Sequence, residues 1–275
     1  MRSFVPDFEL STPASLSEAL ALLASGAIPF AGGTDVMVGL DAGQLTHRHF
    51  VNLATLTELR SIEERNNAIQ IGALSTYTEI ATSNLIAKHF PMLATAARQT
   101  GCLAIQNRGT IGGNIANASP AADSCPVLLA YDASILLRSS IGQRTIPYQQ
   151  FHTGYKETLL APGELIEAIR LPIREGIWRD HFRKVGPRQA QAIAKLSLAA
   201  SAQVINGKIN TIRIAFGSMA PTPLRCRLTE DQIVSGQVWH LDELQPITDN
   251  RSTAEYRKQV AYNLMKDFIQ SLNQE

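Results

Sequence analysis

Two glycine-rich segments are the parts of this sequence whose residue types best suit chemistry at a ligand. The first, AGGTD at residues 31–35, follows a short apolar run, and the second is GTIGGN at residues 109–114. Paired glycines let the backbone adopt positive φ and let a ligand come close. Successive N–H groups in such turns form a concave nest for a phosphate, to which the hydroxyls of Thr34 and Thr110 can add donors. A tight turn that binds nothing is the other interpretation of each pair.

The remaining sequence narrows the kinds of nucleotide site that these loops can form. Neither loop reads GxGxxG and no GxxxxGK[ST] occurs, which disfavours a Rossmann dinucleotide site and a Walker-type NTPase. The segment after the second loop, NIANASPAAD at residues 114–123, gathers small and polar residues before an apolar helix. Asp123 can accept hydrogen bonds from ribityl or ribose hydroxyls, or it can belong to the N-cap region of that helix.

Composition excludes several other classes of protein. The chain has 275 residues, with 25 Lys and Arg against 24 Asp and Glu, so it lacks the basic excess of a nucleic-acid-binding protein. No run of 18 apolar residues predicts a membrane span, and the start MRSFVPDFEL has no apolar signal-peptide core. Cys102, Cys125 and Cys226 are scattered, and His47 and His49 have no third ligand nearby. We therefore expect no metal site, no disulfide framework and a cytoplasmic location.

The hydrophobic pattern predicts an α+β chain with a boundary near residues 172–180. Asn66-Asn67 lies between two strand-like segments, 61–64 and 68–72, and indicates a hairpin. Asn206-Gly207 indicates a second hairpin, whose alternating apolar residues predict one buried face. A final helix is expected to bury the stripe of apolar residues at i+4 spacing: Tyr256, Val260, Leu264, Phe268 and Leu272.

Five collinear segments carry a resemblance that covers essentially the whole chain. They are FAGGTDVMV (30–38), TIGGNIANASPAADSCPVLLAYDA (110–133), FHTGYKETLLAPGELIEAIRLP (151–172), KVGPRQAQAIAKLSLA (184–199) and GSMAPTPLRC (217–226). Together they resemble the FAD-binding medium subunit of the molybdenum hydroxylases, of the xanthine dehydrogenase and carbon monoxide dehydrogenase type. The resemblance implies a two-lobed FAD-binding domain of the vanillyl-alcohol-oxidase (PCMH) type over residues 1–175, with lobes of about 1–55 and 56–175. A small domain with a three-stranded antiparallel sheet and helices would occupy residues 176–275.

The resemblance also assigns roles to residues of the two loops and beyond. The first loop would wrap the FAD pyrophosphate with Ala31, Gly32, Gly33, Thr34, Asp35 and Val36, and the second phosphate and ribityl wall would consist of Thr110, Gly113 and Asn114. Asp123 would hold a hydroxyl beside the flavin, Ile166 or its neighbour Leu165 would contact the isoalloxazine, and Lys184 would lie at the polar edge of the flavin. A cation there stabilises negative charge on the reduced ring.

Three positions qualify this assignment. Tyr155 matches a tyrosine near the place where nicotinamide would approach, although a lone loop tyrosine is more often a packing residue. Thr100 stands where the family has an aromatic residue near the adenine, so stacking at that position is not expected. Residues 229–250 are shorter than in the family, which puts in question any partner contact made there.

The resemblance implies an oxidoreductase subunit that contributes the flavin step of a longer electron relay. Molybdopterin would lie on a large partner subunit and [2Fe–2S] clusters on a small one, because three scattered cysteines cannot hold the clusters. Electrons from the clusters would pass through FAD to an acceptor, NAD, during hydroxylation of xanthine or a related heterocycle. A stand-alone FAD-dependent oxidoreductase of the same superfamily and a flavin-free structural subunit are the alternatives.

Overall fold

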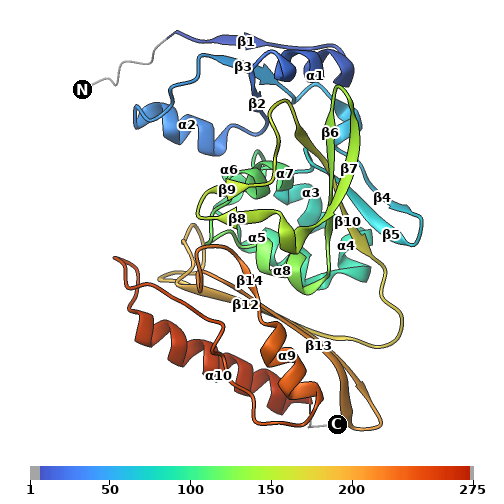
Figure 1. The fold of residues 1–275 in the computed structure, drawn as a ribbon, viewed down its shortest axis with the longest axis vertical. Coiled ribbons are helices and arrows are strands. Elements are labelled where there is room, and N and C mark those ends of the chain that lie inside the picture. The colour runs from blue at the N-terminus through green and yellow to red at the C-terminus, as the bar shows by residue number, and fades with distance from the viewer. Residues whose placement is uncertain (1–6, 273–275) are drawn as a thin grey trace.

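The computed structural model describes residues 7–272, which form three units stacked along the longest axis of the molecule (Figure 1). The N-terminal lobe has a parallel sheet in the order β1-β3-β2. Its strands are β1 (Glu9–Ser11), β2 (Ile28–Phe30) and β3 (His49–Asn52), and its helices are α1 (Leu16–Ala24) and α2 (Thr34–Asp41). Ser15 caps α1 by accepting a hydrogen bond from the Glu18 N–H.

The middle lobe is a five-stranded sheet in the order β4-β5-β10-β6-β7, and all of its neighbouring strands are antiparallel. The strands are β4 (Ile62–Arg65), β5 (Ala68–Gly72), β6 (Ser134–Ser139), β7 (Gly142–Pro147) and β10 (Leu165–Pro172). The helices are α3 (Tyr77–Thr82), α4 (Asn84–His89), α5 (Pro91–Gln99), α6 (Leu103–Gln106), α7 (Ile111–Ala116) and α8 (Cys125–Ala130). Short 3-10 turns lie at Thr57–Leu59 and Tyr148–Gln150, and β8 (His152–Gly154) pairs only with β9 (Glu157–Thr158).

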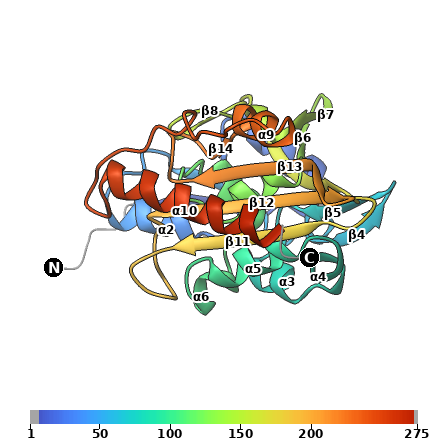
Figure 2. The same cartoon turned by 90° about the horizontal axis from the view of Figure 1, so that it is seen from below.

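The C-terminal domain is an antiparallel sheet in the order β11-β12-β13-β14, with two helices. Its elements are β11 (Arg179–Val185), β12 (Leu196–Ile205), β13 (Lys208–Gly217), β14 (Leu224–Arg225), α9 (Arg227–Val234) and α10 (Ala254–Leu272). The three-stranded sheet that we expected therefore has a fourth, two-residue strand. Figure 2 shows α10 lying across the outer face of this sheet.

Both faces of the C-terminal sheet are buried, which corrects the prediction of one buried face. Leu196, Leu198 and Ala200 pack into the core shared with α10. On the opposite face, Ala199 is also fully buried and joins the core of the middle lobe. Small side chains on this second face let the middle lobe approach. The alternation of apolar residues along the strand marks one buried face, so it does not reveal that a second face is also covered.

The last helix buries a different stripe from the one we expected. Its buried residues are Arg257, Ala261, Met265, Phe268 and Leu272, whereas Tyr256 is 44% exposed. Each step of four residues turns a helix by about 40° beyond one full turn, so a long i+4 series drifts around the axis. Phe268 and Leu272 are buried as predicted, and Val260 and Leu264 are partly buried at the edge of the contact.

Candidate cofactor site

The first glycine loop connects β2 to α2 and lies directly against the second loop. A Cβ added at Gly32 would lie 1.9 Å from the Arg108 carbonyl oxygen, so only glycine allows this approach. Gly33 has φ +77° at the N-cap of α2, and a Cβ there would meet the ring of Phe30 at 2.6 Å. The paired glycines are therefore required by the contact between the two lobes as well as by the turn.

The second glycine loop begins α7. Thr110 is the N-cap residue, and its Oγ1 accepts a hydrogen bond from the Gly113 N–H at 3.2 Å. A Cβ added at Gly112 would lie 2.6 Å from the Ala73 Cβ, which shows how closely α7 packs on the middle lobe. A Cβ added at Gly113 would meet only Thr110 Oγ1 within 4 Å, so no bulky side chain of the described residues fills the space beside this glycine.

A cavity of about 120 Å³ lies between the two loops and is lined by all the loop residues that the sequence singled out. These are Ala31, Gly32, Gly33, Thr34, Asp35, Val36, Thr110, Gly113 and Asn114. Tyr77, Thr100, Ile105 and Gly109 complete the lining. The structure thus brings together two segments that lie more than 70 residues apart in the sequence.

A larger cavity of about 770 Å³ adjoins the first, and Asp35, Thr100 and Asn114 line both. The N-terminal and middle lobes contribute one wall, which includes Asn117, Ser119, Asp123 and Tyr155. The C-terminal domain contributes the other wall, which includes Ile193, Ser218, Asp249, Arg251 and Arg257. A long ligand can therefore extend from the glycine loops to the junction of the two domains.

Asp123 lines the larger cavity and has one carboxylate oxygen without a partner among the described residues. Its Oδ2 accepts a hydrogen bond from the Lys184 Nζ at 2.7 Å, and Lys184 also donates to the Gln99 carbonyl at 2.8 Å. The other carboxyl oxygen, Oδ1, is buried and has no hydrogen-bond partner among the described residues. Burial raises the pKa of Asp123 to about 6, against the lowering effect of Lys184. A buried acceptor without a donor suits a ligand hydroxyl.

The neighbouring contacts show what Asp123 and Lys184 do within the protein. Ser124, not Asp123, occupies the N-cap position of α8, so Asp123 does not serve that helix as its cap. The Lys184 side chain is only 6% exposed and is paired with Asp123, which excludes a solvated surface charge. Lys184 reaches the cavity through Asp123 and does not line it directly.

Leu165 and Ile166 begin β10 and are buried in two different cores. Leu165 packs beneath the N-terminal lobe, and Ile166 belongs to the core of the middle lobe. Neither is among the described residues that line the two cavities. Their contact with an isoalloxazine ring stays a prediction.

Tyr155 lies in the turn between β8 and β9 and lines the larger cavity, with 66% of its surface exposed. The next residue, Lys156, has φ +61° and donates from Nζ to the carbonyl and the side-chain oxygen of Asn117, at 2.8 and 2.7 Å. Asn117 in turn donates to Asp35 Oδ1 at 2.9 Å. An exposed tyrosine at a cavity mouth is not a packing residue, and its turn is tied through Asn117, at the end of α7, to Asp35 of the first glycine loop.

The sequence did not indicate the wall formed by the C-terminal domain. Arg257 belongs to the buried stripe of α10 and donates to the Ser218 carbonyl at 2.9 Å and to Asp249 Oδ1 at 2.7 Å. Residues 229–250 supply Gln245, Ile247 and Asp249 to the same wall. Thr100 lines both cavities, but its hydroxyl donates to the Ala96 carbonyl at 2.9 Å. An arginine among the buried positions of a helix is a signal by which this wall could have been found.

Within residues 7–272, no three His, Cys, Asp or Glu side chains are grouped so that they can hold a metal ion. In the same range, no helix combines the length and apolar character needed to cross a membrane. The three cysteines are free thiols, of which Cys125 and Cys226 are buried. The two adjoining cavities at the glycine loops are the candidate cofactor site.

Two family models divide the chain at the junction between β10 and β11. The FAD binding domain in molybdopterin dehydrogenase matches residues 6–174, and the CO dehydrogenase flavoprotein C-terminal domain matches residues 181–272. The fold is similar to carbon monoxide dehydrogenase from Hydrogenophaga pseudoflava, with a TM-score of 0.89, 28% identity and 96% of each chain covered.

Curated relatives extend over the same length. The chain is 33% identical to the xanthine dehydrogenase FAD-binding subunit of Escherichia coli, over 93% of this chain and 92% of that protein. It is 30% identical to the glyceraldehyde dehydrogenase medium chain of Sulfolobus acidocaldarius, over 96% and 98% respectively. The fold and the cavities thus define a flavoprotein class. The chain belongs to the family of FAD-binding subunits of the molybdenum hydroxylases and is an oxidoreductase subunit.

Proposed function

We propose that this chain is the FAD-binding electron-transfer subunit of a molybdenum hydroxylase complex, which passes electrons from a partner's [2Fe–2S] clusters to NAD. The observation that carries the proposal is the pair of adjoining cavities, which are lined by both glycine loops and by Asp123. The first loop leads into α2, whose first-turn N–H groups suit a pyrophosphate, and the Asp123 carboxylate offers an acceptor to a ribityl or ribose hydroxyl. These donors and this acceptor suit the pyrophosphate and a hydroxyl of FAD.

The residues of this chain bind, orient and tune the cofactor, and no general acid or base is required of them. When bound, FAD supplies a centre that takes electrons singly and releases them in pairs. Thr110 holds the start of α7 by accepting the Gly113 N–H, and the space beside Gly113 holds no bulky side chain of the described residues. Lys184 keeps a positive charge against Asp123 within the buried wall. Tyr155 occupies the mouth of the cavity, where a nicotinamide would approach.

The partners follow from what this chain lacks and from what its relatives are. Described residues form no metal site, so molybdopterin is assigned to a large partner subunit and the clusters to a small one. The relatives are named for xanthine, glyceraldehyde and carbon monoxide, although their flavin subunits share one fold and length. We therefore assign the choice of substrate to the molybdenum subunit, with xanthine or a related heterocycle as the first candidate. Free buried thiols support a cytoplasmic location.

The test begins with the purified chain. We expect a yellow protein whose visible flavin absorbance is lost on cofactor removal and returns on addition of FAD. A colourless chain that binds no FAD would overturn the proposal and favour a structural subunit. Co-expression with the adjacent reading frames should then yield a complex that contains molybdenum and iron. A flavoprotein that never associates with such chains and turns over a substrate alone would identify the stand-alone oxidoreductase instead.

The acceptor is tested separately in the assembled complex. The substrate-reduced complex is mixed anaerobically with NAD, and flavin reoxidation is followed by the return of its absorbance. Rapid reoxidation by NAD supports the assignment, whereas reoxidation only by oxygen or a quinone would exclude NAD. A Tyr155→Ala complex should lose this reaction with NAD and still accept electrons from the substrate.

A further inference from the structure

Asn114 lies where the two cavities meet, and its side-chain amide has one end engaged by the protein. Its Oδ1 accepts a hydrogen bond from the Ser124 hydroxyl at 3.1 Å and faces the Cys125 sulfur at 3.9 Å. Burial raises the pKa of Cys125 to about 12, so this sulfur remains a thiol, and both neighbours of Oδ1 are donors. No described residue accepts from the Asn114 Nδ2, whose two hydrogens are free for a ligand.

The direction of the hydrogen bonds behind Asn114 follows from counting protons. Ser124 has a single hydroxyl proton, and because an amide oxygen only accepts, that proton goes to Asn114. The Tyr77 hydroxyl lies 3.1 Å from the Ser124 oxygen, so Tyr77 must be the donor in that contact. Tyr77 is 2% exposed, and burial raises its pKa well above the usual value, which keeps this proton on the oxygen. The chain therefore runs in one direction, from Tyr77 to Ser124 to Asn114.

The Ser124 hydroxyl does not cap α8, although Ser124 is the N-cap residue of that helix. A serine at a helix N-cap normally accepts a backbone N–H of the first turn. Ser124 is the N-cap residue of α8 but makes no such bond, and it is fully buried. The hydroxyl is committed to Asn114 instead, which indicates a role in the site and not in the helix.

We propose that Ser124 and Tyr77 are positioning residues that hold the Asn114 amide with its N–H groups toward the cofactor. The inference rests on the proposed function, because the acceptor would be an oxygen or ring nitrogen of FAD. Without the Ser124 proton, the amide is free to rotate and to present its oxygen to the same acceptor. Ser124 thus acts on FAD through Asn114 and not by contact.

A double-mutant cycle on FAD binding tests this dependence. Ser124→Ala and Asn114→Ala should each weaken FAD binding by about 3- to 10-fold, the range of one net hydrogen bond. The double variant should bind no more weakly than Asn114→Ala alone, because the serine acts only through the amide. Tyr77→Phe, which keeps the ring in place, should show a smaller loss that also disappears in the Asn114→Ala background.

Ser197→Ala is the matched control, since Ser197 is fully buried and its hydroxyl has no partner within residues 7–272. It should leave FAD binding unchanged. Additive losses in the cycle, or a Ser124→Ala variant that binds like the control, would overturn the positioning role. If the unaltered chain binds no FAD, the proposed function fails instead, so the two failures are distinguishable.

Discussion

Asp123 is the residue at which protonation should be visible in cofactor binding. Burial raises its pKa to about 6, and its free oxygen accepts a ligand hydroxyl best when the carboxyl is ionised. Binding therefore favours the deprotonated form, and FAD affinity should fall as pH decreases through about 6. The limit is tenfold weaker binding per pH unit below the pKa. Titrations of the cofactor-free chain from pH 7.5 to pH 5 measure this slope.

Asp123→Asn is the control for this pH dependence, because an amide of the same size does not titrate. It should bind FAD more weakly at neutral pH and with little dependence on pH. The sign for stability is opposite. Because the pKa of Asp123 is higher in the folded cofactor-free chain, its protonation stabilises the folded state. This stabilisation is complete below pH 3.8, the ordinary pKa value, and is lost as pH rises through about 6. An Asp123→Asn variant with the same pH slope as the parent would show that another group is responsible.

Gly32 is the residue that most directly limits how close the two loops lie. Gly32→Ala places a methyl group 1.9 Å from the Arg108 carbonyl oxygen, and backbone atoms cannot move aside as a side chain can. We expect a loss on the order of 1–3 kcal/mol in the free energy of unfolding, together with weakened FAD binding. Urea unfolding and FAD titration measure the two effects.

Gly39→Ala in the same lobe is the comparison for that substitution. Its added methyl would meet only the flexible Leu45 side chain at 3.1 Å, and alanine is the better helix former in α2. It should leave unfolding and FAD binding nearly unchanged. Equal effects at both glycines would show that loss of backbone freedom, and not the contact between loops, determines the outcome.

At the scale of elements, the sequence predicted turns better than it predicted buried faces. Both hairpins form where asparagine and glycine indicated them, with positive φ at Asn66, Asn67, Asn206 and Gly207. A turn depends on the conformational preferences of its own residues. Which face of β12 or α10 is buried depends on the neighbours that pack against it, and these lie elsewhere in the sequence.

The same difference applies to the candidate site. Glycine, threonine and asparagine in the loops carry a local signature, so their shared cavity was predictable. The wall from the C-terminal domain was not, because Arg251 and Arg257 reach the cavity only through the placement of a second domain. Ser124 gave no signal either, since its role depends on the distant Tyr77.

The β8–β9 hairpin is the element that positions Tyr155, and it belongs to no larger sheet. An isolated two-stranded hairpin is only marginally stable, so the Lys156 contacts with Asn117 should matter for its order. Lys156→Met keeps the length of the side chain but removes its donors. We expect amide hydrogen exchange across residues 152–158 to become about 5-fold faster, as for the loss of about 1 kcal/mol of local stability.

Lys208→Met is the control, because it makes the same substitution at a lysine that follows a tight turn. Lys208 is exposed at the start of β13, away from the β8–β9 hairpin. Exchange in the β8–β9 hairpin should remain unchanged in that variant. If Lys156→Met leaves exchange unchanged as well, then His152, which bonds the Ile115 carbonyl at 2.9 Å, is sufficient to anchor the hairpin.

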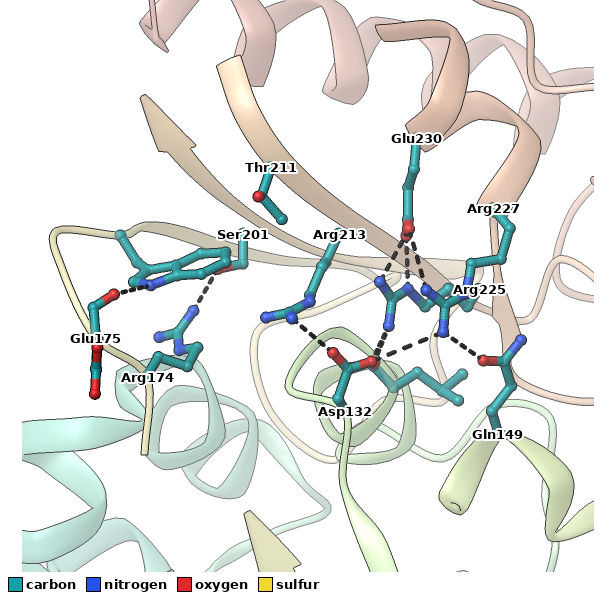
Figure 3. A network of polar contacts seen from close by, with 12 residues as sticks. Asp132, Gln149, Arg174, Glu175, Ser201, Thr211, Arg213, Arg225, Arg227 and Glu230 are labelled. Carbon is teal, nitrogen blue, oxygen red and sulfur yellow. Dashed lines mark hydrogen bonds and ion pairs between the residues drawn. The ribbon is translucent and has the colours of Figure 1, made fainter. Parts of the chain in front are cut away.

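At the scale of the whole molecule, the larger cavity exists only if the C-terminal domain keeps its place on the middle lobe. Figure 3 shows the polar contacts at that junction. Asp132, at the end of α8, pairs with Arg213 at 2.8 Å and with Arg225. Arg225 also makes two contacts with Glu230, at 2.7 and 2.9 Å.

Near this cluster, Arg174 binds Asp180 and Ser201 and stacks on Tyr131. Charged groups thus join the two domains beside their apolar contact.

Arg225→Met tests whether this junction controls the cofactor site. The Arg225 side chain is 3% exposed, so its removal leaves the buried Glu230 carboxylate without its main partner. Breaking such a pair typically costs about 3–5 kcal/mol, and the C-terminal domain should unfold in a separate, earlier calorimetric transition. FAD binding should weaken as well, because one wall of the cavity is no longer held.

Arg227→Met is the matched control, since Arg227 is half exposed and lies 3.9 Å from both Asp132 and Glu230. It should cost at most about 1 kcal/mol. A single transition with unchanged FAD affinity in Arg225→Met would show that the apolar contact alone fixes the two domains.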